Sequence, residues 1–169
     1  MNCKALLTCD KVIIDRQGTH SLINVILNVS IKLQEAQAGQ TPKEIQIPKS
    51  ATAPTQWWVY TLWEPSQADV GRSFRQIYEV YWPSGDKLET PKLELPFVQQ
   101  DDKQQQTTYS IVGFPVGQEG DVTILTWLES SEGKQITDKL TSHVRIEHLT
   151  GKVNPPAMPS HISPFAKPQ

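Results

Sequence analysis

The amino-acid sequence predicts an all-β protein: a two-sheet antiparallel β-sandwich, immunoglobulin-like or similar. Apolar and polar residues alternate along most of the chain, and turn residues divide it into about eight short runs of strand length. Nothing resembles the strand–helix–strand alternation of a parallel sheet. We predict one sandwich domain over residues 1–150, followed by an extended Pro-rich tail, flexible or lying along the surface, over residues 151–169.

The first elements read as a hairpin and a long strand. Leu6–Cys9 and Val12–Ile14 are short apolar runs, and Asp15–Gly18 supplies turn chemistry with a glycine that tolerates positive φ. From Ser21 to Leu33 every odd position is apolar, so we predict one long strand with that row facing the core. The row consists of Ile23, Val25, Leu27, Val29, Ile31 and Leu33.

The middle of the chain contains a short edge strand and a strand with two apolar faces. Ile45–Ile47 alternates between Pro42 and Pro48, as an edge strand does. Trp57–Trp63 is apolar on both faces, which indicates a strand buried by a second layer or by an interface. Pro65–Gly71 is predicted to form a brief helical turn.

The remaining strands follow the same alternation. Their apolar rows are predicted at Phe74–Trp82, Leu93–Phe97 (an edge strand), Tyr109–Phe114, Val122–Leu128 and Val144–Ile146. Gln99–Gln106 is predicted to be a solvated loop.

Composition argues against several partners. The net charge of −2 with scattered lysines provides no basic patch for nucleic acid. No stretch approaches the roughly 20 apolar residues of a membrane helix. Asp10 and Lys11 interrupt the apolar start, so no secretory signal is evident. We therefore expect a soluble, cytoplasmic protein with no nucleic-acid or membrane partner.

No catalytic constellation emerges. Asp15, His20 and Ser21 are the residue types of a hydrolase triad, but they lie on one hairpin where neighbours face opposite ways. No Gly-x-Ser-x-Gly elbow is present. His143 and His148 are five residues apart on a strand, hence on opposite faces. We interpret the chain as a non-enzyme that needs no cofactor.

The two cysteines are predicted to be free thiols. Cys3 and Cys9 would lie about 20 Å apart on one extended strand. A disulfide needs Cα atoms within about 7 Å of each other. Without a nearby histidine they also make a poor zinc site.

Loop acids suggest a calcium site only if separate loops converge. Asp69, Asp101, Asp102 and Asp121 fall in predicted loops. Calcium takes six to eight oxygen ligands, but no single loop has the spacing of a calcium motif. We predict no metal site and keep calcium binding as an alternative.

The tryptophans are the main candidates for an interaction surface. Trp57 and Trp58 are neighbours and must point to opposite sides of their strand, so at least one leaves the core unless another layer covers it. Three roles remain open: core packing, sugar stacking and protein contact. Trp127 is a further aromatic candidate, and the predicted surface comprises Trp57, Trp58, Trp63 and Trp82.

The beginning of the chain resembles a known pattern. Cys9–Asp15, Gly18 and Ser21–Val25 are similar to the opening of an uncharacterised bacterial family, a domain of unknown function. Pro83–Gly85 and Gly120–Asp121 suit the layout of that family. The resemblance implies a small β-sandwich, and it carries no substrate, cofactor or catalytic residue.

These observations favour a non-catalytic binding or scaffolding module that contacts another protein or self-associates. The alternative is a calcium- or carbohydrate-binding sandwich. The Pro-rich tail adds a candidate ligand for a partner, because polyproline II is ordered before it docks.

Overall fold

The protein is built from two β-sheets. The computed structural model describes residues 1–32, 47–96 and 98–149. Within these residues the only helical element is a 3₁₀ turn at Gln67–Asp69. In chain order the strands are β1 Asn2–Ile14, β2 His20–Val25, β3 Asn28–Lys32, β4 Thr52–Glu64, β5 Phe74–Tyr81, β6 Lys87–Leu88, β7 Leu93–Glu94, β8 Gln105–Pro115, β9 Gly120–Ser130 and β10 Leu140–Leu149.

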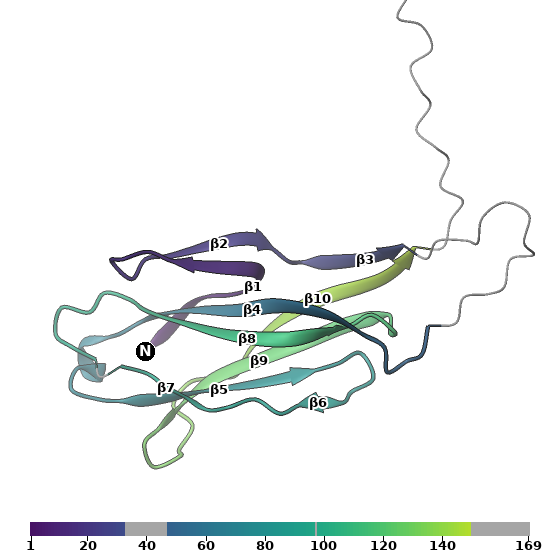
Figure 1. The fold of residues 1–169 in the computed structure, drawn as a ribbon. Helices are drawn as coiled ribbons and strands as arrows, with labels where there is room; N and C mark the ends of the chain where they lie inside the picture. The colour runs from purple at the N-terminus through teal and green to yellow at the C-terminus, as the bar shows by residue number, and fades with distance from the viewer. Residues whose placement is uncertain (33–46, 97, 150–169) are drawn as a thin grey trace, which may run out of the picture.

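The two sheets are mostly antiparallel and lie one on the other (Figure 1). The first has the strand order β2–β1–β4–β8, and the second has the order β3–β10–β9–β5–β6, with β7 also paired to β5. The pairing of β3 with β10 is parallel, and the other pairings between described strands are antiparallel. The prediction of an all-β fold with two mainly antiparallel sheets is confirmed.

The main core lies between the sheets. In β4, β5, β9 and β10 the residues that contribute to it are two apart, because successive side chains of a strand point to opposite faces. In β8 they are three apart, with Gly113 at a φ of 94° between them. The first sheet supplies Trp57, Val59, Ile111 and Phe114, and the second supplies Tyr78, Val80, Val122, Ile124, Val144 and Ile146. The inward rows predicted in β5, β9 and β10 are therefore confirmed.

A buried network of hydrogen-bonded side chains also links the sheets. Gln76 of β5 is fully buried. Its Oε1 accepts hydrogen bonds from Trp63 Nε1 at 3.1 Å and Thr107 Oγ1 at 2.5 Å, both from the first sheet. Its Nε2 donates to Thr126 Oγ1 in β9 at 2.9 Å. Each polar atom of this side chain has a partner, as buried polar groups require.

The predicted long strand from Ser21 to Leu33 is wrong as a single element. The chain forms β2 in the first sheet, passes through Ile26 and Leu27, and forms β3 in the second sheet. Ile26 N donates to Thr8 O at 2.8 Å, whereas Leu27 O accepts from Arg145 N at 3.1 Å. Because the strand changes sheet here, one continuous alternation cannot keep one row inward.

This crossing reverses the predicted burial of the first half of the row. Ile23, Val25 and Leu27 were predicted to face the core, but their exposed fractions are 39%, 46% and 71%. Ile26, which is not part of the predicted row, packs against the core together with Val29 and Ile31.

The turn between β1 and β2 forms as predicted. Asp15 Oδ1 accepts hydrogen bonds from the backbone of Thr19 and Gln17, each at 2.8 Å. These bonds, led by that from Thr19, hold the pKa of Asp15 below its usual value. Gly18 has a φ of 81°, which a residue with a side chain seldom adopts.

Two smaller predictions have different outcomes. The helical turn predicted within Pro65–Gly71 is confirmed by the 3₁₀ turn. The loop predicted at Gln99–Gln106 is too long, because β8 already begins at Gln105. Gln105 is buried, its backbone pairs with Trp63, and its Nε2 donates to Pro96 O at 3.1 Å.

Several predictions fall wholly or partly outside the described residues, among them the last residues of two predicted rows, Leu33 and Phe97. The edge strand predicted at Ile45–Ile47 does so except for Ile47, which lies in no strand. The Pro-rich tail at 151–169 and the domain boundary at residue 150 lie wholly outside them.

Candidate protein-docking surface

The first strand bends back over its own sheet. Along β1, Leu7 lies opposite Tyr60 of β4, and Ile14 lies opposite His20 of β2. In a straight strand this separation would place His20 about 23 Å from Tyr60. The rings of His20 and Tyr60 are instead 5.8 Å apart, edge to face at 65°. Figure 1 shows β1 turning back on itself before it enters the hairpin with β2.

The hairpin covers the outer face of the first sheet. Val59 and Thr61 face the core, since Val59 is fully buried and Thr61 Oγ1 lies 2.8 Å from the Tyr78 hydroxyl of the second sheet. Tyr60, between them, must face outward, yet it is only 8% exposed. The hairpin therefore acts as a partial third layer, and burial raises the pKa of Tyr60.

The underside of the hairpin packs on that face. His20 lies against Tyr60, and Val12 and Leu22, opposite each other in the hairpin, are half-buried. His20 Nδ1 is buried without a hydrogen-bond partner in the described part of the chain. Burial lowers the pKa of His20, because the charged imidazolium loses solvation there.

The rest of the hairpin presents aliphatic side chains to solvent. Of the eight large apolar side chains that are exposed within the described residues, five lie between positions 13 and 27. We call these five the hairpin surface: Ile13 (46% exposed), Ile14 (56%), Ile23 (39%), Val25 (46%) and Leu27 (71%). Ile13 and Ile14 are neighbours on β1 and face opposite ways, and Leu27 follows the end of β2, so the five lie around the hairpin and not on one face.

The hairpin surface adjoins an open sheet edge. β2 is the first strand of its sheet and pairs only with β1 among the described strands. Between Arg16 and Lys32 the sequence contains no Asp, Glu, Lys, Arg or Pro. Proteins usually protect an open edge with such residues, and this edge has none of them.

The structure separates the four tryptophans predicted as an interaction surface. Trp57 and Trp63 are interior side chains, 1% and 0% exposed, and Trp57 Nε1 donates to Gly113 O at 2.9 Å. Trp58 and Trp82 are half-buried, and Trp82 packs against the main core. Of the four, Trp58 lies on the outer face of the first sheet, opposite Cys9. Trp57 and Trp63 are therefore not accessible to a partner of the folded chain.

Sequence reasoning missed the hairpin surface itself. The alternation predicts Ile23, Val25 and Leu27 in the core, and the turn residues predict a hairpin but no exposed apolar side chains on it. One signal was present in the sequence: Ile13 and Ile14 are adjacent apolar residues on a strand, so they cannot both face the same layer.

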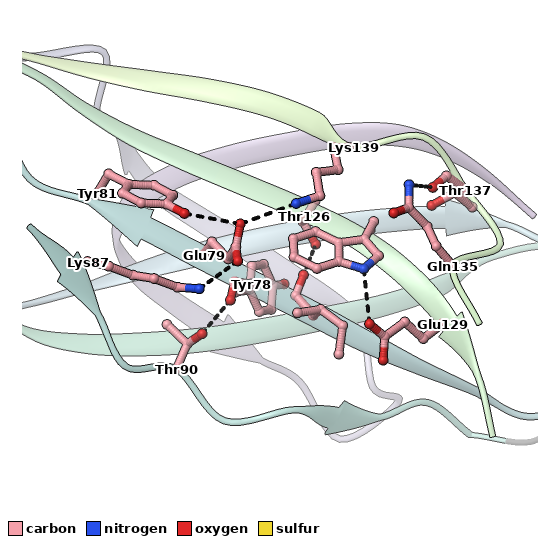
Figure 2. A network of polar contacts seen from close by, with 12 residues as sticks. Tyr78, Glu79, Tyr81, Lys87, Thr90, Thr126, Glu129, Gln135, Thr137 and Lys139 are labelled. Atoms are coloured by element: carbon pink, nitrogen blue, oxygen red, sulfur yellow. Dashed lines mark hydrogen bonds and ion pairs between the residues drawn. The ribbon is translucent and has the colours of Figure 1, made fainter. Parts of the chain in front are cut away.

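The outer face of the second sheet is polar and internally paired. Glu79 accepts hydrogen bonds from Lys87 Nζ at 2.6 Å, Tyr81 OH at 3.3 Å and Lys139 Nζ at 3.4 Å, and Figure 2 shows these side chains around it. Partial burial raises the pKa of Glu79, but the bond from Lys87 and the charge of Lys139 outweigh it, so this pKa lies below its usual value. Lys139 Nζ also lies 4.1 Å from the ring centre of Trp127. This tryptophan face is thus occupied by the chain's own lysine.

A cavity of about 340 Å³ lies among the turns at one end of the sandwich. Lys49, Glu119 and His148 are among its lining residues. The His148 ring lies 2.8 Å from Val116 O, and the His148 backbone N donates to Glu119 Oε1 at 2.8 Å. His148 and Glu119 of this cavity thus already form hydrogen bonds within the protein.

The aspartates considered as calcium ligands bond to different neighbours and do not converge on one site. Asp69 Oδ2 accepts from Ser66, Asp102 Oδ2 accepts from the Gln99 backbone, and Asp121 pairs with Arg145 at 3.2 Å. Over residues 1–32, 47–96 and 98–149, no cluster of three His, Cys, Asp or Glu has the arrangement of a metal site.

The residues considered for catalysis and disulfide chemistry are also placed. Asp15 caps the hairpin turn, while His20 lies against Tyr60. Cys3 and Cys9 are free thiols, as predicted, and burial raises the pKa of each.

Comparison with known proteins finds no match. No protein-family model matches the chain, and no curated protein is significantly similar to it. Among the described residues there is no helix long and apolar enough to cross a membrane.

Proposed function

We propose that this protein is a non-catalytic binding or scaffolding module, and that it contacts another protein or a second copy of itself through the hairpin surface. The observation that carries the proposal is the presence of five exposed aliphatic side chains within residues 13–27, out of eight exposed large apolar side chains in the described part of the chain. Burying a full aliphatic side chain contributes about 1.5–3 kcal/mol, so half-exposed ones still gain about 1 kcal/mol each on contact. A few such side chains in one place are enough to anchor an interface.

Two further features support a protein partner over a small ligand. The side chains of the hairpin surface are exposed around a hairpin, whereas small-molecule sites are concave. The adjoining β2 edge offers unpaired backbone groups, and extended segments of other proteins add to sheets at such edges.

We also propose an immunoglobulin-like sandwich as the scaffold. In that fold one sheet holds strands C, F and G, and strands B and E are neighbours in the other. The orders β10–β9–β5 and β4–β8 are compatible with G–F–C and B–E. The β1–β2 hairpin would then be an addition at the start of the fold. Membership of the bacterial family that the first residues resemble stays a prediction.

Site-specific photo-crosslinking tests the proposed function. A photoreactive amino acid replaces Ile13, and in a matched control it replaces Val112, a 73% exposed residue on β8. We expect the probe at position 13 to form a defined protein adduct in cells that express the chain, and the probe at position 112 to form none. Equal labelling from both positions, or no adduct from either, would contradict the proposal.

A further inference from the structure

We draw no further inference here: the strongest candidate, the open β2 edge with the exposed aliphatic side chains around the β1–β2 hairpin, already carries the proposed function, and nothing in the described part of the chain shows what covers it.

Discussion

At the scale of single residues, Gln76 is the side chain whose environment is most tightly specified. It is buried between the sheets and bonded to Trp63, Thr107 and Thr126. Tyr78, two residues along β5, continues the polar contacts, with its hydroxyl 2.8 Å from Thr61 Oγ1. Burial, partly offset by hydrogen bonds from threonines, raises the pKa of Tyr78 to about 12. These bonds fix the lateral position of one sheet on the other.

Replacing Gln76 tests this role. Gln76→Leu should lower the free energy of unfolding by about 2–4 kcal/mol, because it leaves Trp63 Nε1 buried without an acceptor. Urea unfolding monitored by tryptophan fluorescence measures the change. Gln100→Leu, the same substitution at an exposed position, should change stability by less than about 0.5 kcal/mol. A similar loss of unfolding free energy in both variants would argue against a stabilising role for the hydrogen bonds of Gln76.

At the scale of elements, the hairpin of β1 and β2 packs with its underside on the outer face of the first sheet. Its underside rests on Tyr60 through His20, and its turn is closed by Asp15. This environment favours the neutral imidazole, because burial lowers the pKa of His20 and its Nδ1 has no partner among the described residues. Docking of the hairpin should therefore depend on pH.

The direction of this pH dependence follows from the lowered pKa of His20. The contribution of His20 to stability is present above the ordinary histidine pKa of about 6.5 and is lost as pH falls through the lower folded value. We expect amides of β2 to exchange faster, relative to those of β9, at mildly acidic pH once intrinsic exchange rates are corrected. His20→Phe should keep the ring contact and remove this dependence. If the exchange of β2 amides in His20→Phe depends on pH as it does in the unmodified chain, a group other than His20 causes the dependence.

At the scale of the whole molecule, one charged group ties together separate parts of the second sheet. Glu79 of β5 contacts Lys87 of β6 and Lys139, which directly precedes β10 (Figure 2). The lowered pKa of Glu79 means that its contribution is present above the ordinary glutamate pKa and is lost as pH falls through the folded value.

Neutralising Glu79 should therefore weaken the fold at neutral pH more than at acidic pH. Glu79→Gln is expected to cost about 1 kcal/mol at neutral pH, since its partners are half exposed and screened by solvent. The difference from the unmodified chain should begin to shrink as pH falls below the ordinary glutamate pKa of about 4.3, and it should disappear below the lowered folded pKa of Glu79. Thermal unfolding across pH measures it. Glu132→Gln, at an exposed position, serves as the control, and an equal effect there would contradict the assignment.

The sequence predicted the strands better than their arrangement. Alternation located β5, β9 and β10 with their buried rows, and turn chemistry located the hairpin at Asp15–Gly18. These features are local, because side-chain direction and turn geometry depend on near neighbours. The docking surface was not predicted, because Ile23 and Val25 alternate in the same way whether their row faces a core or solvent.

By itself the sequence determined the all-β class, the position of most strands and the absence of charge from residue 17 to residue 31. Only the tertiary structure decided that the chain crosses between sheets at Ile26–Leu27, that β1 bends over Tyr60, and that Trp57 and Trp63 are interior. The physical reason is that pairing between strands is non-local. Which face of a strand is buried depends on the segments that pack against it, and these come from distant parts of the chain.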